Sequence, residues 1–369
     1  MMGKQPSLRD LKKRSLDDLR REVKKIEDRL SKDKRKIITY SKNFTLSLSN
    51  YCSNQCGYCF YNYKVPKVDG ESNVIILGDD QMKDIIQKGM QNDCKEVLLI
   101  SGERPDSFPE VKQELEQRNC PDFISFIKDI CTYLLDFKLL PHVNIGLLNR
   151  AEMEELKPFT ASMGLMLEST SLKLFKKGGV HEFSPGKRPK KRINHIENAG
   201  KLKIPFTTGL LIGIGETFED RIKDLLLINR LHEEYGHIQE VILQNFIQKA
   251  GIAYTPEREV SIEEMLRLTG IARIIFGNRI GIQVPPNLIQ GHEKRFLDMG
   301  ITDFGGISPF TIDYINPEQS WPQIEHLSSI CEEEGYILRE RLPIYEKYIH
   351  QSDFCPETIK KVIDNINLS

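Results

Sequence analysis

The chain has 369 residues, of which 39% are hydrophobic and 28% are charged, and its formal net charge is −1. A net charge this close to zero gives no general attraction to nucleic acid or to anionic lipid. No apolar run reaches the length of a membrane span, and the start of the chain lacks the apolar core of a signal peptide. We therefore expect a cytoplasmic protein whose cysteines stay reduced.

Residues 8–30 predict an amphipathic helix that packs on the outside of the fold. Its apolar residues recur at gaps of three and four: Leu16, Leu19, Val23, Ile26 and Leu30. The pattern is too short to indicate a coiled coil. We assign residues 1–39 to an N-terminal helical extension, residues 40–345 to the main domain and residues 346–369 to a C-terminal helical tail.

Short apolar runs alternate with helical patterns through the main domain. The apolar runs predict strands at 44–49, 96–101, 142–147, 162–168, 206–213, 240–246 and 280–284. Helices are predicted at 79–93, where Asp79 or Asp80 can cap the first turn, and at 123–137, 192–202 and 219–236. This strict alternation predicts an α/β fold with a parallel sheet closed wholly or partly into a TIM-type barrel, whose site lies at the carboxyl ends of the strands.

Three of the eight cysteines lie within eight residues, in the loop after the first strand: Cys52, Cys56 and Cys59. Structural zinc would need a fourth ligand from elsewhere, and an odd number of cysteines does not suit a disulfide framework. Three thiolates on a four-iron cluster leave one iron open for a reactant. The other cysteines are irregularly spaced, and we expect them to be buried hydrophobic residues: Cys94, Cys120, Cys131, Cys331 and Cys355.

The Cys-x3-Cys-x2-Cys loop, with the aromatic Tyr58 before its last cysteine, resembles that of the radical S-adenosylmethionine (SAM) enzymes. The resemblance implies that Cys52, Cys56 and Cys59 hold a [4Fe-4S] cluster whose open iron chelates SAM. It also implies a low-potential electron donor, because one electron splits SAM to a 5′-deoxyadenosyl radical.

Ser101, Gly102 and Glu103 end the second predicted strand, where a glycine permits close approach of the backbone and a carboxylate can bind an ammonium group. The resemblance places the segment that binds the SAM amino group here, with Ser101 in place of the usual first glycine. It assigns Glu168, at another strand end, to the SAM ribose. A structural salt bridge is the alternative for this carboxylate.

Arg192 is a candidate for the SAM carboxylate, which a guanidinium grips through two hydrogen bonds. The basic residues around it suggest a solvated loop: Lys187, Arg188, Lys190 and Lys191. The segment Gly209–Glu216 has the G-x-[IVL]-x-G-x-x-E form that follows a strand in this superfamily. Its Gly213 and Glu216 are assigned by resemblance to the adenine side of SAM.

Longer runs resemble the deazaflavin-synthase family, the FO synthase subunits of the CofG type, over roughly residues 40 to 345. They include LLPHVNIG (139–146), SPGKRPKKR (184–192), HIQEVILQNFIQKAG (237–251), QVPPNL (283–288) and DFGGISPFTIDYINPEQSWP (303–322). The resemblance implies a carbon–nitrogen lyase of coenzyme F-420 biosynthesis. A CofH-type partner enzyme would make 5-amino-5-(4-hydroxybenzyl)-6-(D-ribitylimino)-5,6-dihydrouracil, and this chain would cyclise it to 7,8-didemethyl-8-hydroxy-5-deazariboflavin (FO) with release of ammonia.

Neutral polar residues at strand ends suit the uracil edge and the ribityl hydroxyls of such a substrate. The substrate candidates are His142, Asn144, Gln244, Asn245, Gln283, Asn287 and Asp313. The carboxylates Asp303, Asp313 and Glu318 suit either binding of the ribityl chain or proton transfer. His142, Asn144 and Asp303 are the candidates for catalytic residues. The family's Asp-Trp-Gly-Gly-like segment has Phe304 in place of tryptophan, which we expect to keep an aromatic wall without an indole donor.

Two alternative interpretations remain open at this point. A related radical SAM enzyme, such as CofH or an enzyme of the menaquinone pathway, would share the cysteine loop and the barrel but not the long runs together. A non-catalytic iron–sulfur or zinc protein would need a fourth ligand, and it would give no role to Ser101, Gly102 and Glu103.

Overall fold

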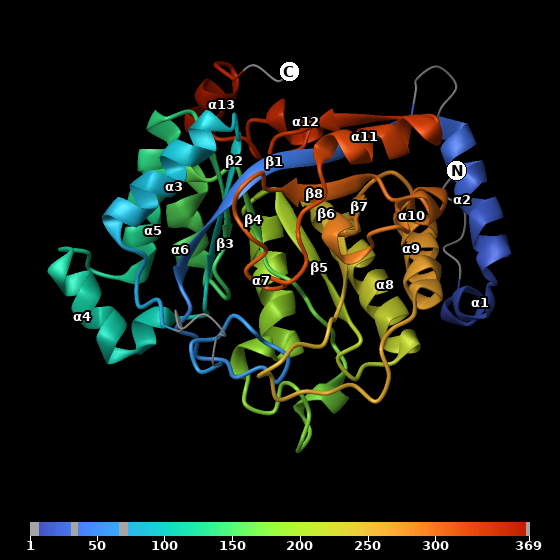
Figure 1. Ribbon diagram of the computed structural model, residues 1–369, viewed down its shortest axis with the longest axis horizontal. Coiled ribbons are helices and arrows are strands. Elements are labelled where there is room, and N and C mark those ends of the chain that lie inside the picture. Colours follow the sequence, from blue (N-terminus) through green and yellow to red (C-terminus); the bar gives the residue numbers. More distant parts are fainter. Residues whose placement is uncertain (1–6, 31–35, 66–72, 367–369) are drawn as a thin grey trace.

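The computed structural model describes residues 7–30, 36–65 and 73–366. In these residues eight parallel strands close into a barrel and a ninth strand extends the sheet (Figure 1). The strand order is β2-β3-β4-β5-β6-β7-β8-β1-β9, and pairing of β1 with β2 closes the barrel, which confirms the predicted fold class. The strands are β1 (Lys36–Ser49), β2 (Glu96–Ser101), β3 (Leu140–Asn144), β4 (Ser162–Gly164), β5 (Phe206–Ile212), β6 (Ile238–Asn245), β7 (Gly281–Gln283), β8 (Asp303–Ile307) and β9 (Tyr336–Glu340).

The longest strand, β1, has three partners. Residues 36–40 pair with β9, and residues 43–49 pair with β2. Residues 39–42 pair with β8 on the opposite edge. The strand begins at Lys36, before the predicted start of the main domain at residue 40, because β9 supplies a partner for these first residues.

Every predicted strand has a counterpart, although the bounds differ. The largest difference is in β1, which begins at Lys36 instead of residue 44, because β8 and β9 pair with its first half. Strand β4 ends at Gly164 instead of residue 168, and Glu168 adopts a left-handed backbone conformation (φ +64°) and forms only an isolated bridge with Leu210. The sequence pattern predicts neither β8 nor β9. Two adjacent glycines interrupt the apolar pattern of β8, and β9 is a short edge strand with charged residues.

Helices surround the barrel (Figure 1). They are α1 (Leu8–Lys13), α2 (Leu16–Leu30), α3 (Asp79–Gln91), α4 (Pro109–Gln117), α5 (Phe123–Asp136), α6 (Arg150–Leu156), α7 (Pro189–Lys201), α8 (Phe218–Tyr235), α9 (Ile262–Phe276), α10 (Glu293–Asp298), α11 (Ile324–Glu333), α12 (Glu346–Ile349) and α13 (Glu357–Ile363). Short 3-10 helices lie at Pro105–Ser107, Lys157–Phe159, Leu172–Phe175, Pro185–Lys187 and Pro286–Leu288.

Two details of the helices differ from the predictions. The helix predicted over 8–30 is two helices, because Ser15 and Asp18 exchange side-chain and backbone hydrogen bonds that start a new helix. The N-cap of α3 is Gly78, which makes no side-chain capping bond, so neither Asp79 nor Asp80 is the cap. Both carboxylates lie in the first turn, where their negative charge interacts favourably with the positive end of the helix dipole.

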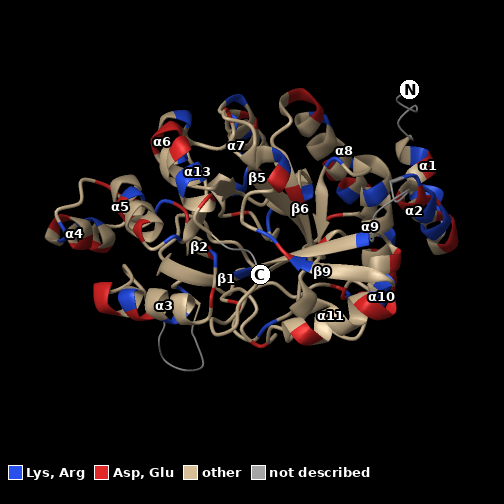
Figure 2. Ribbon diagram, turned by 90° about the horizontal axis from the view of Figure 1, so that it is seen from above, with Lys and Arg blue, Asp and Glu red and all other residues tan. Residues whose placement is uncertain are grey.

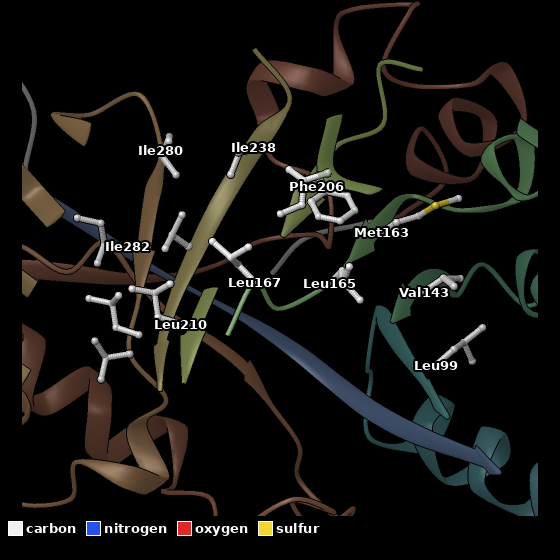
Figure 3. Close-up of a cluster of buried hydrophobic side chains, with 14 of the residues drawn as sticks. Leu99, Val143, Met163, Leu165, Leu167, Phe206, Leu210, Ile238, Ile280 and Ile282 are labelled. Atoms are coloured by element: carbon white, nitrogen blue, oxygen red, sulfur yellow. The ribbon is translucent and has the colours of Figure 1, made fainter. Parts of the chain in front are cut away.

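Apolar side chains of neighbouring strands form a buried layer of the hydrophobic core (Figure 3). Leu99, Met163 and Phe206 are almost completely buried in this layer. In β6, Val241 and Leu243 belong to the buried core, whereas the alternate residues face the barrel interior. This alternation leaves polar side chains inside the barrel, and they form the site described below.

Acidic and basic residues are interspersed on the outer helices (Figure 2), in agreement with the near-zero net charge. In the described part of the chain, no helix is long and apolar enough to cross a membrane. The N-terminal helices cover one side of the barrel, where Leu19 of α2 is fully buried beside Gly270 of α9.

Candidate active site

The cysteine loop follows β1 at the carboxyl end of the barrel. Cys52, Cys56 and Cys59 are all partly buried, and none of them forms a disulfide. The backbone amide of Glu103 donates a hydrogen bond to the Cys52 Sγ over 3.2 Å, and the Ser184 hydroxyl donates one to the Cys56 Sγ over 3.2 Å. Hydrogen bonds to sulfur suit thiolate ligands, because they stabilise the negative charge.

The chemistry of the three thiols fits an iron–sulfur cluster. Burial raises the pKa of Cys59 to about 12, and repulsion from Cys56 and Cys52 acts in the same direction. A bound cationic metal centre reverses this effect and stabilises the thiolates. In the described residues, no three His, Cys, Asp or Glu side chains are grouped to hold a single metal ion. A cluster does not require such a group, because each thiolate binds a different iron.

The segment Ser101–Glu103 lies directly against the cysteine loop. The Gly102 amide donates to the Ser49 carbonyl over 2.7 Å, and the Ser53 amide donates to the Glu103 carbonyl over 2.9 Å. The Glu103 carboxylate is buried and accepts a hydrogen bond from the Leu147 amide over 3.2 Å. The fold thus places a buried carboxylate next to the first cysteine.

Glu168 and Arg192 lie on the same cavity wall. The Glu168 carboxylate pairs with Lys187 over 2.6 Å, and Arg192 donates to the Met166 carbonyl. Lys187 is therefore mostly buried, which corrects the interpretation of this residue as part of a solvated loop. In the described residues, the buried Arg192 Nε has no hydrogen-bond partner, so this guanidinium retains a donor for an anionic ligand.

Gly213 and Glu216 form a braced turn after β5. The Glu216 carboxylate accepts hydrogen bonds from the Gly213 and Ile214 amides, each over 2.8 Å, and pairs with Arg221 over 2.6 Å. Gly213 and Gly215 have positive φ angles of 100° and 110°, which glycine adopts without strain. Glu216 thus holds the turn in place, and its carboxylate is saturated by groups of the chain itself.

A cavity of about 370 Å³ runs from the cysteine loop into the barrel. It brings together most of the predicted site residues: Cys52, Cys56, Tyr58, Cys59, Ser101, Gly102, Glu103, His142, Asn144, Glu168, Arg192, Gln244, Asn245, Gln283 and Asp313. A second, more open cavity of about 1080 Å³ lies on the other side of the loop and is lined by Gly213 and Glu216. Cys56 and Cys59 line both cavities, so the loop separates them.

Three other candidates lie away from the barrel cavity. Asn287 is buried behind it and donates to the Asp313 carboxylate over 3.0 Å. Asp303 begins β8 at the amino end of the barrel, where it pairs with Arg341. It is therefore a structural ion-pair partner at the end of the barrel opposite the cysteines. Glu318 is exposed.

Phe304 does not form a wall of the site. Its side chain is completely buried in the hydrophobic core outside the barrel cavity. The aromatic wall comes instead from Trp321, whose buried Nε1 has no partner in the described residues. Phe304 and Trp321 lie in the same sequence segment, but the Phe304 side chain is on the face of β8 that packs against the hydrophobic core.

The segment after β8 covers the cavity with residues that the sequence pattern does not reveal. Tyr314, Asn316 and Trp321 of this segment line the cavity beside the buried Lys249. Lys249 Nζ donates to the Asn316 side-chain oxygen over 2.8 Å, and Asn316 donates to Asp313 over 2.9 Å. The signal for this covering segment is its prolines and glycines, which are typical of functional loops.

Comparisons with known proteins define the class of this barrel. Residues 46–228 match the model of the Radical SAM superfamily. The fold resembles the FeFe-hydrogenase maturase HydG from Carboxydothermus hydrogenoformans (TM-score 0.69, 18% identity, 97% of this chain and 78% of that one). It also resembles methylornithine synthase PylB (TM-score 0.67, 19% identity, 91% and 95%). The protein is thus a radical SAM enzyme.

Curated relatives identify the family within this class. The 7,8-didemethyl-8-hydroxy-5-deazariboflavin synthase of Methanococcus vannielii is 46% identical over 89% of this chain and 91% of its own length. The synthase of Methanocaldococcus jannaschii is 44% identical over 90% of each chain. The chain belongs to the 7,8-didemethyl-8-hydroxy-5-deazariboflavin (FO) synthase family and functions in deazaflavin biosynthesis.

Proposed function

We propose that the enzyme cyclises 5-amino-5-(4-hydroxybenzyl)-6-(D-ribitylimino)-5,6-dihydrouracil to FO. The substrate gives one hydrogen atom to the deoxyadenosyl fragment of SAM, and ring closure and aromatisation release ammonia, one proton and one electron. This electron balances the one that cleaves SAM. The observation that carries the proposal is the barrel cavity, because it joins the three thiols to a polar interior in a chain of the FO synthase family.

The chain's own residues fit a cluster and SAM at the cysteine end of this cavity. Cys52, Cys56 and Cys59 would hold a [4Fe-4S] cluster, which when bound supplies the electron that generates a 5′-deoxyadenosyl radical from SAM. The buried Glu103 carboxylate beside Cys52 suits the SAM amino group, and the free Nε of Arg192 suits its carboxylate.

The other SAM contacts follow from the positions of the remaining candidates. Tyr58, Ser101 and Gly102 line the cavity near the cysteines, and Glu168 faces the same space for the ribose. Gly213 and Glu216 shape the turn after β5, on the outer side of the cysteine loop. We assign Glu216 a positioning role, because the Gly213 and Ile214 amides and Arg221 already use its carboxylate oxygens.

The proposed reaction implies two partners, and we place it in the cytoplasm. A CofH-type enzyme would supply the substrate, and a low-potential carrier would supply the electron. We assign His142, Asn144, Gln244, Asn245, Gln283 and Asp313 to substrate binding, because all of them line the cavity.

The test is anaerobic turnover of the cluster-reconstituted chain with SAM, a reductant and the product of a CofH-type enzyme. FO fluorescence together with 5′-deoxyadenosine is the expected result. Deoxyadenosine without FO would retain radical SAM chemistry and reject the substrate. Neither product from a protein with full iron and sulfide content would reject both.

A further inference from the structure

The amino end of the barrel cavity is unusually polar. In a barrel, inward-facing residues that are two apart lie at successive depths. Asn43 of β1 pairs with Glu96 of β2, and Thr207 of β5 pairs with Glu240 of β6, at the deepest level. All four residues line the cavity together with Arg341, which follows β9. We call these five residues the cavity floor. Parallel barrels normally fill this space with branched apolar side chains.

One guanidinium serves two buried carboxylates at the floor. Arg341 donates to Asp303 from Nε over 2.5 Å and from Nη2 over 2.9 Å, but to Glu240 only from Nη2 over 2.9 Å. The other Glu240 oxygen accepts from the Thr207 hydroxyl over 3.3 Å, which is a long hydrogen bond. Burial raises the pKa of Glu240 to about 8, and the nearby Asp303 carboxylate acts in the same direction. Glu240 is thus the less saturated carboxyl group, and it is the one that faces the cavity.

Glycines of β8 make room for two amide side chains, Asn43 of the floor and Gln283 next to it. A β-carbon at Gly305 would lie 1.9 Å from the Gln283 Nε2, and one at Gly306 would lie 2.2 Å from the Asn43 Nδ2. Gly305 also has a φ angle of +79°, which favours glycine. The adjacent glycines therefore make room for two amide side chains inside the barrel.

Aromatic side chains line only the half of the cavity near the cysteine loop, and the floor has none. Near the cysteine loop, aromatic and apolar side chains line it beside the charged groups assigned to SAM, and they include Tyr61, Leu211, Ile315 and Trp321. At the floor it is lined by amide, hydroxyl and carboxyl groups. Such a cavity fits a ligand with an aromatic half at one end and several hydroxyl groups at the other.

We propose that the cavity floor binds the polyhydroxylated ribityl chain of the substrate, with hydroxyl groups on Glu240, Thr207, Asn43 and Gln283. The hydroxybenzyl half then lies near the cysteine loop, where hydrogen abstraction takes place. This inference rests on the proposed function and adds the orientation of the substrate and a role for residues that no motif indicates.

The test compares two ligands on the cluster-reconstituted chain under anaerobic conditions. The first is FO, and the second is the same deazaflavin with an unsubstituted alkyl chain in place of the ribityl chain. Trp321 is the only tryptophan of the protein and lines the cavity, so quenching of its fluorescence reports binding. Glu240→Gln and Thr207→Val should each weaken FO binding about tenfold, because each removes or weakens a hydrogen bond to a hydroxyl group. Binding of the alkyl ligand should change by less than about twofold.

Glu340→Gln is the matched control, because Glu340 is also buried near the amino end of the barrel but does not line the cavity. It should leave the affinities for both ligands unchanged. Equal losses for both ligands in Glu240→Gln and Thr207→Val would assign the floor a purely structural role and overturn the inference. So would unchanged FO binding in both variants. If wild-type protein makes FO, either result rejects only the role of the floor in binding the ribityl chain. Failure of the wild type to make FO rejects the proposed function itself.

Discussion

Gly102 lies so close to Tyr51 that a β-carbon at position 102 would stand 2.0 Å from the Tyr51 carbonyl oxygen and 2.7 Å from the Cys52 Cβ. The contact joins the end of β2 to the start of the cysteine loop. Both atoms belong to segments held by backbone hydrogen bonds, so neither can move without displacing the loop. The glycine between Ser101 and Glu103 is therefore required for the position of Cys52 as well as for ligand approach.

Gly102→Ala should reduce cluster incorporation. The added methyl group must push the cysteine loop away from β2, which moves Cys52 relative to the other two thiols. We expect iron and sulfide content after reconstitution to fall several-fold. Gly78→Ala is the control, because a β-carbon at Gly78 would have no neighbour within 4 Å. Full cluster content in Gly102→Ala would show that the loop accommodates the methyl group.

Removal of any one of Cys52, Cys56 and Cys59 by substitution with alanine should abolish SAM cleavage. A four-iron cluster that leaves one iron for SAM needs all three thiolates. Cys120→Ala should retain cleavage, because Cys120 lies in the segment after α4, outside both cavities. The measurement is 5′-deoxyadenosine formed with dithionite as reductant. Retained cleavage in Cys56→Ala would refute the assignment of the cluster.

Gln283→Ala and His142→Ala should lower FO formation while SAM still binds. Both residues line the barrel cavity, and the His142 Nδ1 is hydrogen-bonded to Ser162 over 2.6 Å, which fixes the orientation of the ring. Loss of one oriented polar group should cost about tenfold in kcat/KM. SAM binding, measured by equilibrium dialysis, should stay within about twofold of wild type. Unchanged product formation would remove these residues from the substrate site.

Lys187→Met should weaken SAM binding and destabilise the fold. Glu168 is buried, and without Lys187 its charge loses its closest partner. Removal of one member of a buried ion pair costs about 3 kcal/mol. Lys190→Met, at an exposed position three residues further on, is the control and should behave as wild type. The measurements are the urea midpoint and the SAM dissociation constant, and a wild-type midpoint would show that Arg192 alone stabilises Glu168.

Acid should destabilise the protein through His195. Burial, reinforced by the Arg192 charge, lowers the pKa of His195 to about 3, and its Nδ1 accepts a hydrogen bond from the Leu148 amide over 3.1 Å. The unfolded chain binds a proton near the ordinary pKa of about 6.5. His195 therefore contributes no pH dependence above this value, and it costs about 1.4 kcal/mol of stability per pH unit as the pH falls from 6.5 toward 3.

The check is urea unfolding of wild type and His195→Gln at about pH 7, 6 and 5. The first value lies above the pKa of the unfolded chain, and the other two lie between the two pKa values. The variant should lose less stability on acidification than wild type, although its stability at neutral pH is lower. His326→Gln, at an exposed position of α11, should follow the wild-type curve. Parallel curves for His195→Gln and wild type would mean that His195 is protonated in the folded protein.

The sequence predicts the barrel, and the residues that it assigns to the cysteine end line one cavity, because both depend on local patterns. Apolar runs predict the strands, and the spacing of Cys52, Cys56 and Cys59 predicts their chemistry. The deeper half of the cavity depends on long-range pairing instead. From the sequence alone, Glu240 resembles an exposed residue of an apolar strand. The structure pairs it with Thr207, and both side chains line the cavity. Likewise, only the tertiary structure shows that Asp303 lies at the opposite end of the barrel from the cysteines.

Phe304 and Trp321 illustrate the same limit within one segment. A residue's place in a motif does not determine the side of the strand to which it points, and a strand that is not predicted has no predicted direction. Phe304 therefore faces the core, whereas Trp321, in the following loop, supplies the indole at the cavity.

The three partners of β1 have a consequence for biosynthesis on the ribosome. Thr39 of β1 and Asp303 of β8 are 264 residues apart, and β9 lies further along still. Contacts between such distant segments form late, because the intervening chain must first be made. The nascent chain thus emerges with the cysteine loop attached to a strand that lacks two of its neighbours. We expect iron loading to follow translation, since the segment after β8, which covers the cavity beside the thiols, is among the last parts of the chain to emerge.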